Sequence, residues 1–456
     1  MQVAFVHDHL TQEGGAERVL QAFQAIWPEA PTYTLVFDPE RLGSLVAGHR
    51  IVPSFLQRFP GARRHPQWYL PLMPTATESY DLRPYDVVLS SCSALAKGVI
   101  TRSNTVHLCY CHTPTRYLWS DTHQYVADLP YPRFMKWAIR RMLTRLRAWD
   151  QQAAQRVDRF IANSRNVSER IAKYYRRDSV VVYPPVDVAR FTVTRPAGRF
   201  FLTGGRLVPY KRFDLVVQAF NRLGIPLQVF GEGPESPKLR ALAKPNVRLL
   251  GKISPEALAE CYARCRAFIQ PQVEDFGITA VEAMAAGRPV IAYGAGGAME
   301  TVVPGLTGAL FEEQTWESLA DAVVRFQPEA YEPEKIRRSA RQFSAATFSA
   351  KIRALVEGEW QQLQARRWPA HRVSDAIREH RAVFTQTPAP GRAEKKDQGD
   401  ASRSPGSARV AALPIGSSEQ APHLRAVRSA VVVQRVQGPH QQGPDAKFDD
   451  RGGDGV

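Results

Sequence analysis

Two glutamates lie on either side of a glycine in the segment EDFGITAVEAMAAGRPVIAYG, a spacing that could bind a polar ligand. Seven residues separate Glu274 from Glu282, and Gly277 between them predicts a tight turn with a helix that begins near Ile278 and Thr279. Free amides at the start of a helix, together with its dipole, favour a diphosphate. We expect Glu274 to lie near a sugar and Glu282 to reach a ribose. The alternative is that Glu282 is a solvated helix residue.

A second group suited to phosphate chemistry lies in turns between a predicted strand and a predicted helix. Arg206 and Lys211 follow the run RFFLTGG, so both are expected at the mouth of a sheet. Arginine offers a fork of donors and lysine a point charge to an anion. Gly14 and Gly15 form a turn in which the backbone could approach a ligand without a Cβ in the way. They do not form the GxGxxG fingerprint, which disfavours an NAD enzyme.

Polar and aromatic residues follow two further predicted strands. His112 comes directly after the apolar run LCYC, at the carboxyl end of a strand, where ligand-binding residues gather. Arg116, Tyr117 and Trp119 follow it and are either acceptor-side or loop-packing residues. Asn163 and Ser164 end a later strand, where they point toward the same edge or cap the next helix; capping is favoured.

No metal site is expected. No Asp-x-Asp occurs in the part of the sequence that looks globular, and the spacing of Cys109, Cys111 and His112 is too compressed for a zinc set. The sequence therefore predicts neither a metal nor a cofactor.

Alternating strand and helix patterns predict the architecture that would position these residues. Apolar, β-rich runs alternate with amphipathic helical patterns up to about residue 325, in two series joined near residues 183–191. Such alternation is typical of parallel sheets covered on both faces. We expect an α/β protein of two doubly wound Rossmann-like domains, with the ligand in a cleft between them at the carboxyl ends of the strands.

The expected boundaries follow the same patterns. Residues 1–185 form the first domain, residues 190–345 the second, and residues 346–368 a helix that crosses back to the first. Residues 372–456 are rich in Pro, Gly, Ser, Gln and Arg and lack hydrophobic periodicity. We expect this tail to be disordered.

Composition limits the class of protein. The 456 residues carry 60 Lys and Arg against 44 Asp and Glu, a net charge of +16, and 44% of them are hydrophobic. No apolar run is long enough to span a membrane, the start does not resemble a signal peptide, and five cysteines argue against a disulfide framework. The basic residues are dispersed rather than striped with aromatics, so no nucleic acid is expected. A cytoplasmic protein is predicted.

One helical pattern over residues 132–149 combines an apolar face with many basic residues. The apolar positions are Met135, Ala138, Ile139, Met142, Leu146 and Trp149. A core-packed helix with a solvated basic face is the slightly favoured interpretation. The alternative is contact with an anionic membrane surface, which would place the protein on the inner face of the cell membrane. The basic and aromatic segment 61–73 would strengthen this alternative if it lay on the same side.

Four motifs, in this order, resemble the retaining glycosyltransferases of family 4, which have the two-domain GT-B fold. They are GGAERV, YCHTPTRYLW, GGRLVPYKRFDLVVQAF with FGEGPE, and the glutamate segment. The resemblance covers most of residues 1–365. It implies a metal-independent enzyme whose substrate is a nucleotide-sugar donor.

The resemblance also implies roles for individual residues. The implied catalytic group is His112, Glu274, Arg206 and Lys211. The implied donor-binding residues are Gly14, Gly15, Arg206, Lys211, Gly251, Lys252, Phe276, Gly277, Ile278, Thr279 and Glu282. Arg116, Tyr117, Trp119 and Asn163 form a weaker acceptor group. Contacts to the base near Gly251 and Lys252 come mostly from backbone in this family, so they leave no mark of the base in the sequence.

The motifs most resemble mannosyltransferases of bacterial polysaccharide assembly, including O-antigen enzymes. They imply GDP-mannose as donor and a glycan or lipid-linked hydroxyl as acceptor. A UDP-sugar-dependent enzyme of the same fold and a noncatalytic nucleotide-sugar-binding scaffold remain alternatives. A phosphorylase or nucleotide-sugar epimerase of the same fold is a further alternative, although a glycogen-type phosphorylase would need a pyridoxal lysine that the sequence does not place.

Overall fold

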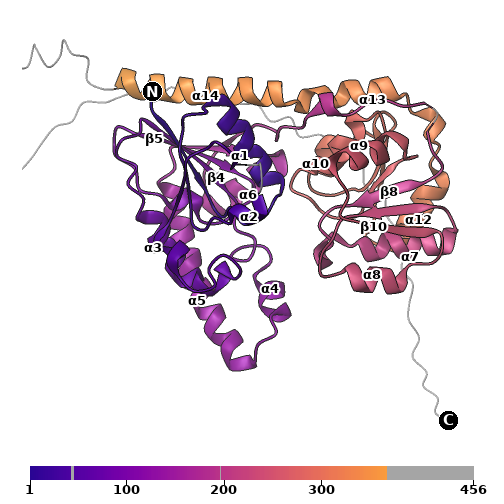
Figure 1. Cartoon of the computed structure of the whole chain (residues 1–456), viewed down its shortest axis with the longest axis horizontal. Coiled ribbons are helices and arrows are strands. Elements are labelled where there is room, and N and C mark those ends of the chain that lie inside the picture. The colour runs from indigo at the N-terminus through magenta and orange to yellow at the C-terminus, as the bar shows by residue number, and fades with distance from the viewer. Residues whose placement is uncertain (43–45, 196, 367–456) are drawn as a thin grey trace, which may run out of the picture. The chain divides into compact units, whose positions relative to one another are not determined.

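The computed structural model of the protein describes residues 1–42, 46–195 and 197–366 (Figure 1). The tail expected at 372–456 lies outside these residues. Two parallel sheets, each flanked by helices, account for the described chain. The expected α/β fold with two Rossmann-like domains is therefore confirmed.

The first sheet has seven parallel strands in the order β3-β2-β1-β4-β5-β6-β7. Their bounds are β1 Val3–His7, β2 Thr32–Thr34, β3 Ile51–Pro53, β4 Val87–Cys92, β5 Val106–Cys111, β6 Arg159–Ala162 and β7 Ser179–Val181. The accompanying helices are α1 Gly15–Ile26, α2 Pro39–Leu42, α3 Met73–Glu78, α4 Thr122–Asp128, α5 Arg133–Gln155 and α6 Arg165–Tyr175. The strand order reverses between β1 and β4, which is where ligands bind in such sheets.

Strand β4 shows why apolar runs form this sheet. Successive side chains alternate between the two faces. Val87 and Leu89 accordingly join one buried cluster, while Val88 joins another on the opposite face. Because both faces are covered, the run is continuously apolar up to Leu89, and polar residues appear only toward the carboxyl end of the strand.

The second sheet has six strands in the order β10-β9-β8-β11-β12-β13. Their bounds are β8 Phe201–Gly204, β9 Leu227–Phe230, β10 Val247–Gly251, β11 Phe268–Gln270, β12 Val290–Tyr293 and β13 Gly308–Phe311. The helices are α7 Phe213–Leu223, α8 Ser236–Leu242, α9 Pro255–Arg264, α10 Ile278–Ala285, α11 Ala298–Thr301, α12 Trp316–Arg325, α13 Pro333–Ala340 and α14 Ala345–Arg366. Here the order reverses between β8 and β11.

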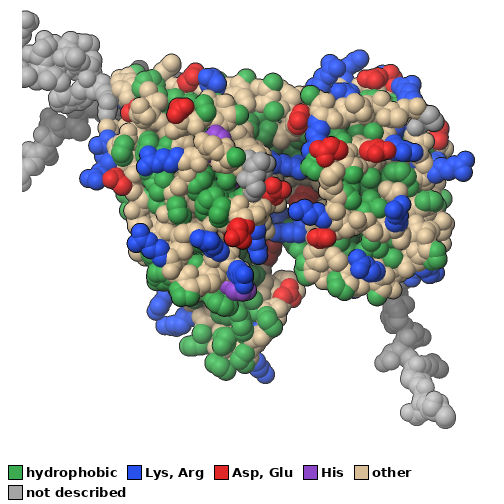
Figure 2. Space-filling view, viewed as in Figure 1, with side chains coloured by type: hydrophobic (Ala, Val, Ile, Leu, Met, Phe, Trp, Pro, Cys, Tyr) green, Lys and Arg blue, Asp and Glu red, His purple; other side chains and the backbone are tan. Residues whose placement is uncertain are grey.

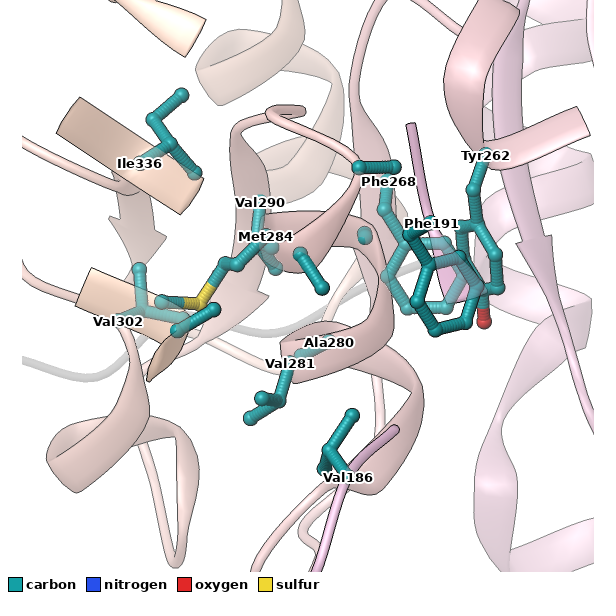
Figure 3. Packing of buried hydrophobic residues seen from close by; sticks show 14 of the residues in the cluster. Val186, Phe191, Tyr262, Phe268, Ala280, Val281, Met284, Val290, Val302 and Ile336 are labelled. Carbon is teal, nitrogen blue, oxygen red and sulfur yellow. The ribbon is translucent and has the colours of Figure 1, made fainter. Parts of the chain in front are cut away.

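Helix α10 is held from several sides. Ala280, Val281 and Met284 pack within a cluster that includes Val302 and Ile336 (Figure 3). Every residue from Ala280 to Ala285 is buried, so the helix has almost no freedom to shift. This packing fixes the position of its N-terminus at the carboxyl edge of the sheet.

The last described helix returns to the first sheet. Phe348, Ile352 and Val356 of α14 are buried in the same cluster as Phe5 and Phe23. The ring of Phe348 stacks on that of Phe23, with centroids 5.6 Å apart. Helix α14 therefore completes the core on one face of the first sheet.

Candidate active site

The turn after β1 brings α1 close to α10. Gly14 precedes α1 in an extended conformation, and a Cβ there would lie 2.9 Å from Oε2 of Glu17. A Cβ at Gly15 would lie 3.0 Å from Cδ1 of Ile278. The glycine pair therefore permits close approach of a carboxylate and of the start of α10.

His112 directly follows β5 and is held through backbone and ring. Its N–H donates to the carbonyl of Cys92 (2.8 Å), and Nδ2 of Asn163 donates to its carbonyl oxygen (2.8 Å). Nε2 of its ring lies 2.8 Å from Oγ of Ser91. Desolvation, and then the neighbouring His7, lower the pKa of His112 to about 4, so the ring is neutral at neutral pH.

The two polar residues that follow β6, Asn163 and Ser164, have separate roles. Oγ of Ser164 accepts from the N–H of Val167 and caps α6, whereas the side chain of Asn163 supports the backbone of His112. Asn163 is therefore not itself the capping residue.

The aromatic residues after His112 pack rather than point outward. Nε1 of Trp119 donates to Oδ2 of Asp150 (2.8 Å), and its ring stacks on Tyr174 at 5.2 Å. The ring of Tyr117 lies 5.5 Å from that of Tyr125. These contacts favour the loop-packing interpretation for both residues.

Arg116 makes a different kind of contact. Its Nη2 lies 2.7 Å from Oδ2 of Asp275, and Nη1 of Arg170 lies 2.8 Å from Oδ1 of the same carboxylate. Asp275 is next to Glu274, so two arginines from the first domain meet the glutamate segment. Sequence reasoning did not single out Asp275 or Arg170, although the adjacent acids in EDFG were a usable signal.

Lys211 and Glu274 form an ion pair in this structure. Nζ of Lys211 lies 3.0 Å from Oε1 of Glu274, which also accepts from Nε2 of Gln272 (3.2 Å). Arg206 is exposed, and its Nη1 donates to Oε1 of Gln12 (3.2 Å). Arg212, by contrast, pairs with Asp214 at 3.3 Å.

The N-terminus of α10 has no side-chain cap. Gly277 occupies the capping position at φ 92°, a left-handed conformation that favours glycine. A Cβ there would lie 3.0 Å from both terminal atoms of the Gln270 side chain, which is fully buried. The helix begins at Ile278, as predicted, and Thr279 follows it. Phe276 is buried and stacks on Tyr183 at 5.6 Å.

Glu282 is buried, so the alternative of a solvated helix residue is wrong. Only 4% of the residue is exposed because α10 is enclosed by its neighbours. Its Oε1 accepts from Nη1 of Arg18 (2.6 Å), and its Oε2 accepts from the hydroxyl of Tyr262 (3.2 Å). Arg18 belongs to α1, so Glu282 joins the two domains in this structure.

Gly251 ends β10 at φ 69°, and its carbonyl accepts from the N–H of Gly231 (2.8 Å). Lys252 is exposed. Both residues lie at the carboxyl edge of the second sheet.

Two absences hold for the residues that the structure describes. Over residues 1–42, 46–195 and 197–366, no three His, Cys, Asp or Glu side chains are grouped so as to hold a metal ion. Within the same ranges, no helix has the length and hydrophobicity to cross a membrane.

Comparison with known proteins gives two consecutive family matches. Residues 13–190 match the model of Glycosyltransferase Family 4, and residues 190–343 match that of Glycosyl transferases group 1. A GDP-mannose-dependent alpha-mannosyltransferase of Mycolicibacterium smegmatis is 31% identical over 189 residues, which are 39% of this chain and 50% of that protein. A D-inositol 3-phosphate glycosyltransferase of Geodermatophilus obscurus is 32% identical over 197 residues, 36% of this chain and 44% of that one. The chain thus spans about half the length of the curated relatives it matches.

Solved structures share the fold. The Anabaena protein HepE, crystallised with UDP, superposes with a TM-score of 0.59 at 17% identity, covering 78% of this chain and all of that one. A sucrose-phosphate synthase from Thermosynechococcus elongatus gives 0.60 at 18% identity, covering 80% of this chain and all of that one. The fold shared with these structures is GT-B, and the two abutting matches over residues 13–343 give the chain a Glycosyltransferase Family 4 region followed by a Glycosyl transferases group 1 region.

Proposed function

We propose that the protein transfers a hexose, namely mannose from GDP-mannose, to a hydroxyl of a glycan or lipid-linked acceptor in polysaccharide biosynthesis. The observation that carries this proposal is the Lys211–Glu274 pair (3.0 Å) beside the uncapped start of α10. A cation, a carboxylate and free helix amides are the groups that a sugar diphosphate needs at one place.

The diphosphate would be held without a metal ion. Lys211, Arg206 and the first amides of α10 supply the positive charge that a cation would otherwise supply. These groups would also stabilise the charge that develops as the nucleotide leaves. Removing one such donor typically costs about 3–4 kcal/mol of transition-state stabilisation.

Transfer with retention of configuration needs no protein nucleophile. The acceptor oxygen approaches the anomeric carbon from the side of the leaving group. The bond from that carbon to the phosphate oxygen breaks as the bond to the acceptor oxygen forms, and the acceptor proton passes to the departing phosphate. Glu274 would bind hydroxyls of the sugar, and His112 would face the sugar from the first domain.

Glu282 would bind the ribose only after a rearrangement. Its carboxylate is now occupied by Arg18 and Tyr262. Since Arg18 belongs to the first domain and Glu282 to the second, separation of α1 from α10 would free one oxygen. Donor binding would therefore be coupled to domain movement.

The choice of GDP-mannose is supported by relatives. The Mycolicibacterium protein and a Corynebacterium glutamicum mannosyltransferase, 30% identical over 205 residues, are both named as GDP-mannose-dependent. The name of the second also gives a phosphatidylinositol monomannoside as its acceptor. The alternative donor is a UDP-sugar. The alternative to an enzyme is a noncatalytic scaffold that binds a nucleotide sugar.

Helix α5 supports a lipid-linked acceptor. Its C-terminal half packs as expected through Leu146, but Met135 and Ala138 are exposed rather than buried. Phe134 and Trp137 are 72% and 63% exposed, so the first turns of the helix present large apolar side chains at the surface. The exposed basic residues of the helix are Arg133, Arg140, Arg141 and Arg145. Figure 2 shows apolar and basic side chains side by side over the region of α4 and α5. The start of α5 is proposed to contact an anionic membrane surface.

The membrane contact is tested by co-sedimentation with vesicles of phosphatidylglycerol and phosphatidylcholine. We expect Trp137→Ser to weaken binding several-fold and Val324→Ser, at a similarly exposed apolar residue of α12 in the second domain, to serve as a matched control. Equal binding of neutral and anionic vesicles would contradict the proposal.

The transfer itself is tested with radiolabelled GDP-mannose, UDP-glucose and a bacterial lipid extract, in the presence of a chelator. Label from GDP-mannose should enter the organic phase. If label enters the organic phase only from UDP-glucose, the donor is a UDP-sugar and not GDP-mannose. If a nucleotide sugar binds without transfer or hydrolysis, the noncatalytic scaffold is favoured.

A further inference from the structure

Four polar side chains form a continuous buried chain that ends at His112. Oε1 of Glu17 lies 3.5 Å from Nε2 of His7. Nδ1 of His7 lies 3.0 Å from Oγ of Ser91, which in turn lies 2.8 Å from Nε2 of His112. The chain thus runs from the first turn of α1, across the ends of β1 and β4, to the residue after β5.

The register of the first sheet places these groups in contact. His7 is paired with Ser91 between β1 and β4, and Ser91 is paired with Tyr110 between β4 and β5. His112 follows Tyr110 by two residues, so both side chains lie on one face, with their rings 5.2 Å apart. The arrangement is therefore a product of strand pairing and not of a flexible loop.

Asp8 fixes the end of β1 to the segment that follows β4. Its two carboxylate oxygens accept from the N–H groups of Ser93, Ala94, Leu95 and Ala96, at 2.6–2.8 Å. This carboxylate faces the same region as His9, and burial lowers the pKa of His9. Because its oxygens are bound by four amides, Asp8 restrains the backbone beside His7 and Ser91 without joining the chain of side chains.

Burial removes water as a competing partner. Ser91 is fully buried, and His7 and Glu17 are 3% and 6% exposed. A serine hydroxyl donates one proton, so the two ring nitrogens beside Ser91 Oγ have opposite roles: one accepts that proton and the other donates its own. Nδ1 of His112 has no hydrogen-bond partner among the described residues, in contrast to Nε2.

We propose that Glu17 and His7 act through Ser91 to set which ring nitrogen of His112 carries the proton. The Glu17 carboxylate favours a proton on Nε2 of His7, which leaves Nδ1 of His7 as an acceptor. The Ser91 hydroxyl then donates to His7, and its oxygen accepts from Nε2–H of His112. Nδ1 of His112 is then left with a lone pair.

The ligand group matched to this lone pair is a hydroxyl that donates a proton. This step rests on the proposed function, in which that hydroxyl belongs to the transferred sugar. Glu17, His7 and Ser91 are positioning residues, because each acts through His112 rather than on the substrate.

The tautomer of His112 can be measured directly on the full chain. Two-bond proton–nitrogen spectra of protein with ring-¹⁵N histidine distinguish the two neutral tautomers, and His112→Asn identifies the signal. We expect the proton on Nε2 in the wild type and a mixture in Ser91→Ala. Ser90→Ala is a matched control, because Ser90 is equally buried and binds His107 at 2.9 Å on the same strand.

Two outcomes would overturn the proposal: a proton on Nδ1 in the wild type, or an unchanged tautomer in both Ser91→Ala and Glu17→Gln. The spectra need no substrate, so failure of the proposed mannosyl transfer would leave this test intact. Where transfer is measured, Ser91→Ala should lower kcat/KM about tenfold, the size of one lost hydrogen bond, whereas Ser90→Ala should leave it unchanged.

Discussion

The carboxyl edges of the two sheets carry opposite kinds of polar group. At the edge of the first sheet, His7, Ser91 and Asp8 are buried and hydrogen-bonded to one another or to backbone. At the edge of the second sheet, Arg206 is exposed and the start of α10 has no side-chain cap. The first edge is fixed before any ligand arrives, whereas the second keeps positive charge and free amides for an anion. In the proposed function, the first domain positions the ligand and the second stabilises charge.

The largest expected effect comes from the second edge. Lys211→Ala should lower kcat/KM by about 10²–10³, because one cationic group that faces the leaving diphosphate is lost. Its side chain is 15% exposed and contacts Glu274 at the surface of the site, so folding should change little. Steady-state kinetics with the donor, alongside circular dichroism, provide the measurement.

A matched control for Lys211 is Lys238→Ala, because Lys238 also pairs with a glutamate at 3.1 Å but is far more exposed. Equal losses of kcat/KM in the two variants would contradict a specific role for Lys211 at the edge of the second sheet.

At the first edge we expect a large effect on stability. Asp8→Asn should lower the free energy of unfolding by about 3 kcal/mol, because the amide nitrogen cannot accept from two of the four N–H groups that the carboxylate binds. Urea titration measures the loss. Asp81→Asn, in an exposed pair with Arg83, should have little effect.

The same carboxylate predicts a pH dependence. Burial alone would raise the pKa of Asp8, but His9 and the bound amides lower it overall. Because the folded pKa lies below the unfolded one, the stabilisation is present above the unfolded pKa and is lost as pH falls through the folded pKa. Urea titrations from neutral to acidic pH should show wild type and Asp8→Asn converging. A constant difference would contradict this account.

The smallest effect sharpens the role of the aromatic residues beside His112. Trp119→Phe keeps the ring stack on Tyr174 but removes the bond to Asp150, and should cost about 2 kcal/mol of stability. Activity should be unchanged after correction for folded protein. Trp149→Phe removes an equivalent bond to the more exposed Glu78 and should cost less. If Trp119→Phe raised the KM for the acceptor and left stability unchanged, Trp119 would be an acceptor-binding residue and not a packing residue.

The sequence predicted more of the second sheet's carboxyl edge than of the first sheet's. At the second edge, Gly277 and the start of α10 at Ile278 follow from local patterns, since a turn glycine and an apolar helix are visible in adjacent residues. Lys211 and Glu274 belong to two different motifs, so their pairing cannot be read from any single segment. The sequence resemblance was therefore most informative where function is carried by motifs.

The contacts at the carboxyl edge of the first sheet could not be predicted from the sequence. The chain from Glu17 through His7 and Ser91 depends on strand register between residues 84 positions apart, for which one sequence gives no signal. Burial of Glu282 was missed for a related reason, because its partners Arg18 and Tyr262 come from α1 and α9. Long-range contacts, rather than local chemistry, account for both differences.

The most direct test of the central claim is calorimetric titration of the purified protein with GDP-mannose, GDP, UDP-glucose and UDP, each with a chelator present. The account predicts selective binding of the guanosine pair without metal, and at least tenfold weaker binding in Lys211→Ala. Binding of none of the four by folded protein, or binding that needs a divalent cation, would contradict it.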